Sequence, residues 1–413
     1  MWTRRAFVKG GALAAFASTL GGVPSFLTQS ATAYTRKNAG LGRKKTLVCI
    51  FQRGAMDGIQ AVQPLDDPYL RKVRSDLIVP ATGEGKLIEL NEQFGLNPLL
   101  KPLAPLYQEN RLAIVHGIGS PLATRSHFDA QDYMENGTPG RRGTESGWLN
   151  RATGLLGHEP TPFQAVSLTS ATPKALYGPA YTLTIENLDN LKIAEGEATS
   201  LTNRGFEALY RQTTQAMIQH TGAVSLDAVK VLEEARVSAM LPSEGVIYPK
   251  TPLGTSLRQI AQLVKAGVGL EVAFAESSGW DTHARQNAPY GGFTRNTRDL
   301  SHSIAAFWRD IERYQDDVVI ITMTEFGRTI HQNGSLGTDH GRASCMFVLG
   351  NAIDGGKVHG TVPPLAPENL TDGRDLPVTT DFRSLFAGVV HQHLGIDDTA
   401  TLFPGWSGAR MSI

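Results

Sequence analysis

The chain has 413 residues, of which 41% are hydrophobic, and its 39 basic side chains equal its 39 acidic ones in number. That length and apolar content can bury the core of one large domain or two small ones. The balanced charge and the lack of a basic stripe exclude an electrostatic footprint for nucleic acid, and two cysteines are too few for a disulfide-stapled secreted fold.

Residues 1–33 predict a twin-arginine export signal. The pair Arg4-Arg5 precedes a weakly apolar run, 10–27, and then Ala31-Thr32-Ala33, where a signal peptidase would cut. A membrane anchor is the alternative, but the run is rich in glycine and interrupted by proline, unlike a spanning helix. We expect a mature chain of residues 34–413 without a membrane span, carried by the twin-arginine translocase to the periplasm or the exterior.

The expected export route has a chemical implication. The twin-arginine pathway moves proteins that have already folded, often after a metal or cofactor has been loaded. Removing residues 1–33 leaves 36 basic and 39 acidic side chains, a net charge near −3. The route favours a metalloprotein, and the charge again gives no reason to expect nucleic acid as a partner.

Six short apolar runs predict the strands of one sheet. Near-continuous apolar strands separated by helical segments favour an α/β fold, with a mostly parallel central sheet and helices on both faces. The runs are Thr46–Phe51, Leu112–His116, Phe163–Leu168, Leu270–Ala275, Val318–Met323 and Cys345–Leu349. Cys49 and Cys345 lie inside two of them, so we expect buried thiols, with a disulfide between neighbouring strands as the alternative.

Apolar residues at helical spacing predict the covering helices over Thr255–Ala266, Thr294–Tyr314 and Asp381–Leu394. Residues 170–250 differ, because they hold polar, helix-favouring runs and few strand signals. We interpret them as a helical insertion or cap on a single domain that spans 34–413.

Polar side chains gather where the predicted strands end. In an open α/β sheet, ligands bind outside the carboxyl ends of the strands, so these loops are expected to carry the functional residues. The loops are Gln52–Gly58, Thr124–Asp129, Gly279–His283, Thr324–Thr329 and Gly337–Gly341, the last just before its strand.

Two of these loops combine a carboxylate with an imidazole, at Asp281 with His283 and at Asp339 with His340. Such pairs are ligands for zinc, manganese or iron, whereas carboxylates alone suit magnesium or calcium. An acid after a strand is also a common turn former or helix N-cap. The two pairs in one chain favour a site for one or two divalent ions, with zinc, manganese, magnesium and calcium not distinguished.

Asp57 and Glu325 are further candidate ligands on the same set of loops, and Glu325 is alternatively a partner for Arg328. Arg53, Arg125 and Arg328 could clamp an anionic substrate through bidentate hydrogen bonds, or pair structurally with the loop carboxylates.

Ser126 is the candidate nucleophile, because it lies between Arg125 and His127 ahead of a helix that starts near Asp129. Capping that helix is the alternative role. The chain contains no Gly-x-Ser-x-Gly elbow, which argues against an ordinary esterase.

The motifs together resemble the exported bacterial family called domain of unknown function 1501, over about residues 45–410, and Thr338–Gly341 resembles a metal motif of the alkaline phosphatase and sulfatase superfamily. The resemblance implies an alkaline-phosphatase-like fold with a two-metal cleft. It would make Asp57 the first-strand aspartate, place Ser126 in the nucleophile loop, and make the two carboxylate–imidazole pairs ligands. The sequence departs from the superfamily in its candidate ligands, because Asp57 comes late after its strand, and Asp281 and His283 are spaced Asp-x-His rather than Asp-x-x-x-His. It also lacks the superfamily's nucleophile context and the sulfatase motif Cys-x-Pro-x-Arg.

Two functions follow as expectations. The first is a metal-dependent hydrolase of a phosphate or sulfate ester, acting on an anionic small molecule. The second is a non-catalytic binding or assembly protein on the same scaffold, for a surface polymer or an exported partner, which the altered ligand spacing favours.

Overall fold

The computed structural model describes residues 44–413 except 142, 189–230, 233–234 and 236. The predicted export signal and most of the predicted insertion lie outside the described residues. Among the helices that are described, none is long and apolar enough to cross a membrane.

Within the described residues, nine strands form one central sheet in the order β13-β5-β12-β9-β1-β8-β6-β7, with β14 also pairing with β5. The strands are β1 (Thr46–Arg53), β5 (Leu112–Gly119), β6 (Ala165–Ser167), β7 (Leu183–Thr184), β8 (Val272–Ser278), β9 (Val318–Met323), β12 (Ser344–Leu349), β13 (Val358–His359) and β14 (Thr380–Asp381). All six predicted strands are therefore present, and the α/β class with a mostly parallel sheet is confirmed.

Strand β12 is the exception, because it runs antiparallel to both of its neighbours, β5 and β9. After β9 the chain makes a hairpin of β10 (Arg328–Gln332) and β11 (Thr338–His340) and then enters the sheet again. It re-enters from the edge where β9 ended. Without a crossover to the far edge, an antiparallel strand is the only possibility.

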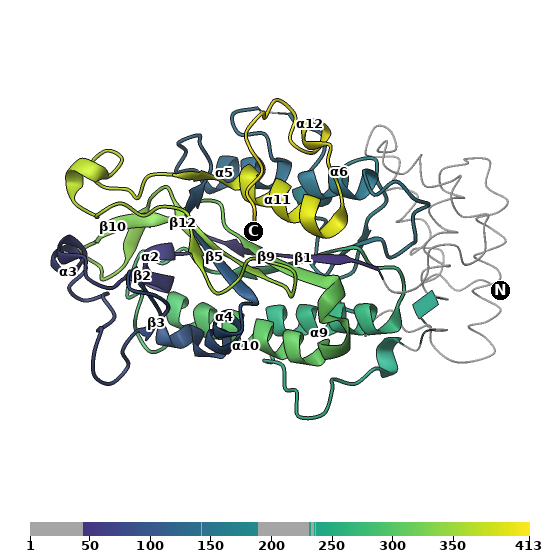
Figure 1. Cartoon of the computed structure of the whole chain (residues 1–413), viewed down its shortest axis with the longest axis horizontal. Helices are drawn as coiled ribbons and strands as arrows, with labels where there is room; N and C mark the ends of the chain where they lie inside the picture. Colours follow the sequence, from purple (N-terminus) through teal and green to yellow (C-terminus); the bar gives the residue numbers. More distant parts are fainter. Residues whose placement is uncertain (1–43, 142, 189–230, 233–234, 236) are drawn as a thin grey trace, which may run out of the picture.

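Helices cover both faces of this sheet (Figure 1). On one face lie α4 (Ala104–Gln108), α9 (Pro252–Ala266) and α10 (Gly292–Asp310), and on the other lie α5 (His127–Asn136), α6 (Trp148–Gly154), α11 (Phe382–Leu394) and α12 (Thr399–Leu402). The three predicted helices are α9, α10 and α11.

The remaining elements are short. They are α2 (Gly58–Ala61), α3 (Pro68–Val73), β2 (Val62–Pro64), β3 (Ile88–Glu89), β4 (Phe94–Leu96) and the 3-10 turns Pro98–Leu103, Lys174–Leu176, Val237–Ala239, Glu312–Asp317 and Pro367–Asn369.

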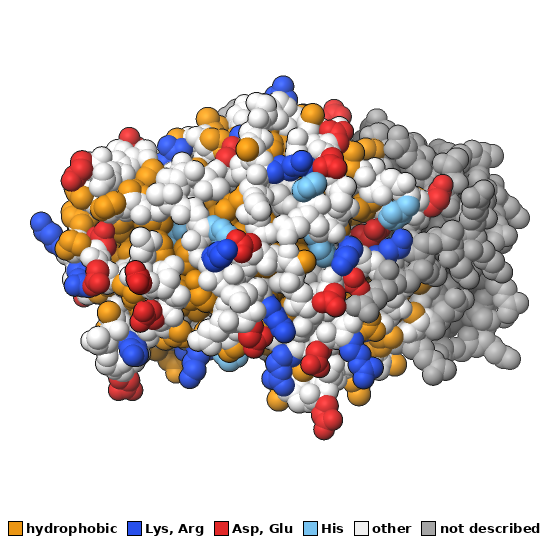
Figure 2. All heavy atoms as spheres, in the orientation of Figure 1, with side chains coloured by type: hydrophobic (Ala, Val, Ile, Leu, Met, Phe, Trp, Pro, Cys, Tyr) orange, Lys and Arg blue, Asp and Glu red, His pale blue; other side chains and the backbone are white. Residues whose placement is uncertain are grey.

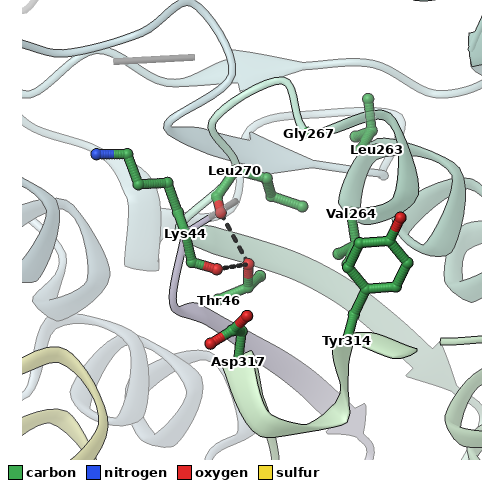
Figure 3. A pocket seen from close by; sticks show the side chains of 8 residues that line it. All are labelled: Lys44, Thr46, Leu263, Val264, Gly267, Leu270, Tyr314 and Asp317. Carbon is green, nitrogen blue, oxygen red and sulfur yellow. Dashed lines mark hydrogen bonds between the residues drawn. The ribbon is translucent and has the colours of Figure 1, made fainter. Parts of the chain in front are cut away.

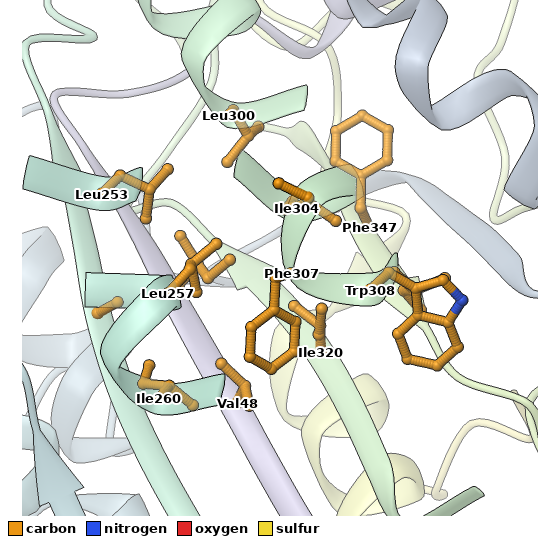
Figure 4. Packing of buried hydrophobic residues seen from close by; sticks show 14 of the residues in the cluster. Val48, Leu253, Leu257, Ile260, Leu300, Ile304, Phe307, Trp308, Ile320 and Phe347 are labelled. Carbon is orange, nitrogen blue, oxygen red and sulfur yellow. The ribbon is translucent and has the colours of Figure 1, made fainter. Parts of the chain in front are cut away.

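The alternation of side chains along β1 builds two cores, one on each face. Val48 packs with Leu257 of α9 and Phe307 of α10, as Figure 4 shows, whereas Leu47 belongs to the cluster around Phe386 of α11. A strand buried on both faces needs apolar residues at nearly every position, which is why the predicted runs were continuous.

Cys49 and Cys345 are buried and unpaired, which confirms the expectation of free thiols. Burial raises the pKa of both thiols well above the ordinary value. On the surface, side chains of both charge signs are mixed over the face in Figure 2, as the balanced composition predicts.

The direction of the strands places the polar loops together. β1, β5, β8 and β9 are parallel to one another, so their carboxyl ends meet at one edge of the sheet. Because β12 runs the other way, the loop before it lies at the same edge. All five polar loops that were predicted to carry functional residues therefore lie at the same edge of the sheet.

Candidate metal centre

Three imidazoles and a carboxylate converge at this edge of the sheet. Nε2 of His340 lies 3.0 Å from Nε2 of His127, 2.9 Å from Nε2 of His283 and 3.2 Å from Oδ1 of Asp281. Nε2 of His283 is also 3.0 Å from Oδ1 of Asp281. Ligand atoms of His127, Asp281 and His340 all lie within 4.8 Å of one another. All four side chains keep some contact with solvent.

The other ring nitrogen of each imidazole faces an oxygen. Nδ1 of His127 is 2.8 Å from the Glu325 carboxylate, and Nδ1 of His283 is 3.1 Å from the Asp339 carboxylate. Nδ1 of His340 is 2.9 Å from the backbone carbonyl of Arg125. Because these oxygens can only accept hydrogen bonds, each Nδ1 carries a hydrogen. In a neutral ring the Nε2 then has a free lone pair, which points toward the other two imidazoles.

Lone pairs that face one another at hydrogen-bond distance repel unless a cation or a proton lies between them. The hydrogen bond to Glu325 raises the pKa of His127, while burial lowers the pKa of His340. A divalent cation between the rings would accept the same lone pairs. In metalloproteins, ligand histidines hold a metal in this arrangement, with the second ring N–H donated to an oxygen.

Glu325 supports the cluster from behind. Its buried carboxylate accepts hydrogen bonds from His127, from Gln131 of α5 and from the backbone N–H of Gly54. Burial acts to raise the pKa of Glu325, but these hydrogen bonds outweigh it, so that the pKa lies below its ordinary value. Glu325 is therefore a partner of His127, and neither a member of the converging ligand set nor the partner of Arg328.

Arg328 is fully buried and cannot clamp a substrate. Its guanidinium donates to Asp281 at 2.6 Å and to the backbone carbonyls of Gly54, Ala55, Trp280 and Thr338. Burial acts to raise the pKa of Asp281, but the hydrogen bond from Arg328 and its charge keep that pKa below the ordinary value. The structural alternative for Arg328 is the one observed: it ties three loops together and orients the Asp281 carboxylate.

Asp57 does not join the cluster. One carboxylate oxygen accepts from Arg74 at 2.8 Å and Gln286 at 2.7 Å, and the other accepts from the backbone N–H of Gln60 as the N-cap of α2. With only 1% of both side chains of the ion pair exposed, this carboxylate is fully committed to internal partners. The assignment of Asp57 as a metal ligand is corrected accordingly.

Gln286 links this buried pair to the cluster. Its side-chain oxygen accepts from the hydroxyls of Thr282, at 2.9 Å, and Thr338, at 2.7 Å. Thr282 lies between Asp281 and His283, and Thr338 directly precedes Asp339. Because one side-chain oxygen binds both hydroxyls, it fixes the loop that carries Asp281 and His283 relative to the loop that carries Asp339 and His340.

Asp339 is half exposed and lies beside His283, where Asn333 also donates to it at 3.1 Å. The hydrogen bond from Asn333 lowers the pKa of its carboxyl. Asp339 therefore supports His283, as Glu325 supports His127.

Ser126 caps α5, because its side chain accepts from the backbone N–H of Asp129. The capping alternative is thus observed, while the nucleophile role stays a prediction. Arg53 is held by Glu135 and Glu276, at 2.9 and 2.6 Å.

Arg125 is 2.8 Å from the buried Asp375, but 45% of its side chain stays exposed. It is the one of the three candidate arginines most available to an anion.

His127 is the ligand candidate that sequence reasoning missed. It lies in the polar loop 124–129, where the position of Ser126 ahead of a helix predicted a nucleophile instead. A histidine at the first position of a helix that follows a strand end, in the same set of loops as two other imidazoles, is the signal that could have found it.

The small pocket in Figure 3 is not part of this centre. It lies at the opposite end of β1, beside Lys44, Thr46 and Leu263, and the Thr46 hydroxyl there donates to the Leu270 carbonyl. Its volume of about 10 Å³ is roughly enough for one water.

The fold and the cluster define an α/β protein with a candidate metal centre at the carboxyl edge of its sheet. Residues 115–404 match the family described as a protein of unknown function, DUF1501, and the chain belongs to that family, as its motifs indicated. No curated protein sequence matches the chain.

Three solved structures show distant similarity. A protein in the alkaline phosphatase superfamily from Vibrio parahaemolyticus is 10% identical, with a TM-score of 0.35, covering 86% of this chain and 76% of that one. Ps i-CgsB, in complex with k-i-k-neocarrahexaose, is 10% identical, with a TM-score of 0.40 and coverage of 90% and 75%. The lipoteichoic acid synthase LtaP from Listeria monocytogenes is 8% identical, with a TM-score of 0.35 and coverage of 90% and 78%. Similarities this distant do not define the activity of this chain.

Proposed function

We propose that this protein is a metal-dependent hydrolase of phosphate or sulfate esters. The observation that supports the proposal is the convergence of His127, His283 and His340 on one point beside Asp281, each with its second ring nitrogen bonded to an oxygen.

The residues present fit a divalent cation. Imidazole nitrogens with one carboxylate are the donor set that zinc and related transition ions prefer, and magnesium and calcium take mainly oxygen. His127, Asp281, His283 and His340 would hold the ion. When bound, it supplies positive charge that polarises a phosphoryl or sulfuryl oxygen of the substrate.

The chain's own residues prepare this site. Glu325, Asp339 and the Arg125 carbonyl hold the three Nδ1 hydrogens in place, so each Nε2 is available as a ligand atom. Arg328 holds the Asp281 carboxylate at 2.6 Å. The cluster lies at the N-terminus of the ten-residue helix α5, and the exposed Arg125 is next to it, so the surroundings favour an anionic substrate.

A test follows from Asp281. Purified mature protein would be assayed against aryl phosphate and aryl sulfate esters, with and without a chelator, and after zinc or manganese is returned. We expect turnover that the chelator removes and the ion restores, that Asp281→Asn abolishes, and that Asp397→Asn, a surface control, leaves unchanged. Turnover that survives both the chelator and Asp281→Asn would refute the proposal.

A non-catalytic binding role is the second candidate, and one observation favours it. The first-strand carboxylate, Asp57, is locked onto Arg74, so the two-ion arrangement that the resemblance implied lacks a ligand. A protein that binds the ion but hydrolyses neither class of ester would favour this second role.

We also propose that the protein works outside the cytoplasm after twin-arginine export, on the basis of Arg4-Arg5 and the segment that follows. Replacing both arginines by lysine should leave uncleaved precursor in the cytoplasmic fraction. Export of the double-lysine variant at the parent's rate would rule out this route.

A further inference from the structure

A cavity of about 470 Å³ opens beside α5, between that helix, Arg141 with residues 143–146, and the segment around Lys174. Asp129, Asp132, Tyr133 and Asn136 of α5 line it. The volume is within the range of small-molecule sites.

This cavity lies on a different face of α5 from the metal centre. His127 and Gln131, one turn apart, face Glu325. The lining positions 129, 132, 133 and 136 are spaced three and four apart, and so share a second face. One helix thus serves two separate sites.

Two deeply buried side chains present unused donors to the cavity. Tyr133 is 7% exposed and Asn136 is 8% exposed, and both line it. Within the described residues the Tyr133 hydroxyl has no hydrogen-bond partner, and neither has the Asn136 amide nitrogen, whose carbonyl oxygen is occupied by Thr138. Neither atom is among the fully enclosed unsatisfied ones, so both remain accessible from the cavity.

Acceptors line the same cavity, Asp129 on the same face of α5 and Glu145 in the loop beside it. In the described part of the chain, the carboxylates of Asp129 and Glu145 carry no side-chain partner, while Asp132 is paired with Lys174. The half-exposed ring of Tyr177 adds an apolar surface at the rim.

This combination selects a class of ligand. A metal ion or an amine would need acceptors alone, and an anion would need donors alone. A sugar presents adjacent hydroxyls that each donate and accept, and a C–H face that packs on an aromatic ring. It can therefore use the donors of Tyr133 and Asn136, the carboxylates of Asp129 and Glu145 and the Tyr177 ring together, and its hydroxyls can also accept from Arg141. We propose that the cavity beside α5 binds a carbohydrate of one or two rings.

The proposal does not rest on the proposed hydrolase function, because the cavity shares a helix with the metal centre but no lining residue. To test it, the mature protein is titrated with methyl glucoside, methyl galactoside, N-acetylglucosamine and disaccharides of these sugars. Binding is measured by saturation-transfer NMR and by calorimetry.

Tyr133→Phe removes only the hydroxyl, and we expect it to weaken binding of the sugar selected by about tenfold, the value of a well-placed hydrogen bond. Glu145→Gln, on the surface, should weaken binding without a change in fold. Tyr107→Phe is the matched control, since Tyr107 is 6% exposed and lies on α4, in the opposite core.

The His340→Ala variant separates the two sites, and it should keep sugar binding at the parent's affinity. The proposal is overturned if none of these sugars binds, or if Tyr133→Phe and Glu145→Gln bind like Tyr107→Phe. Binding that His340→Ala abolishes and Tyr133→Phe spares would put the sugar at the metal centre instead, and would equally overturn it.

Discussion

Asp57 and Asp281 both follow parallel strands at the same edge of the sheet, but their surroundings make them different groups. Asp57 is 1% exposed, and Arg74, Gln286 and the backbone of Gln60 donate to it. Asp281 is 44% exposed on its side chain, receives one arginine, and faces three imidazoles. A carboxylate with its charge compensated internally supports the fold, whereas one that keeps lone pairs toward solvent and other ligand atoms can bind a cation.

The largest effect on stability should come from Asp57→Ala. It leaves the buried Arg74 without its carboxylate, and we expect a loss of about 3–5 kcal/mol in the free energy of unfolding. Denaturant unfolding measures this. The control is Asp66→Ala, because Asp66 pairs with Arg71 on the surface and should cost less than about 1 kcal/mol. Equal costs for the two variants would show that the burial of the Asp57–Arg74 pair adds nothing to stability.

The histidines also divide into buried ones that support the fold and partly exposed ones that face Asp281, and the pH dependence of stability tests this difference. His116 is fully buried, its Nδ1 accepts from the N–H of Gly117, and its Nε2 donates to the Val62 carbonyl. Burial lowers the pKa of His116 to about 4, and lowers that of His393 likewise. An unfolded histidine titrates near 6.5, so between these values the unfolded state binds more protons.

Stability should therefore be complete above about pH 6.5 and fall as pH drops toward 4, by on the order of 3 kcal/mol for His116, since one unit of pKa is about 1.4 kcal/mol. Unfolding measured at several pH values on the parent and on His116→Gln gives the difference. A variant with the same pH dependence as the parent would contradict this assignment.

The next largest effect is expected on metal affinity, because Glu325 orients the candidate ligand His127. Glu325→Gln keeps the size and removes the charge, and we expect metal affinity to fall by roughly 10- to 100-fold, as for other groups that orient a ligand histidine. Competition with a chromophoric chelator measures the affinity. Glu276→Gln, which changes a partner of Arg53, should leave it unaltered, and parallel losses would indicate a general structural effect.

The smallest effect is expected for Ser126→Ala. Removal of the hydroxyl that caps α5 should cost about 1 kcal/mol of stability, and turnover should stay within a few-fold of the parent. Complete loss of turnover in a folded variant would instead make Ser126 the nucleophile.

Much of the fold could be predicted, because a strand buried on both faces must be apolar throughout. The direction of β12 could not, since it depends on where the hairpin of β10 and β11 returns the chain. Asp57 was misassigned for a related reason: an acid after a strand looks the same whether it binds a metal or a distant arginine. Only the packing of Arg74 against it decides.

His127 was missed because no ligand spacing links it to His283 or His340 along the chain; the parallel strands bring them together. By contrast, the convergence of Asp281, His283 and His340 could be predicted, because each stands within a few residues of a strand at the edge where all these loops meet.

The metal centre is tested by the metal content of the mature protein, purified without chelator and measured by mass spectrometry. We expect about one equivalent of zinc or another transition ion in the parent and in His391→Ala, a surface control, and almost none in His340→Ala. A parent without metal, or His340→Ala with the parent's content, would contradict the metal centre.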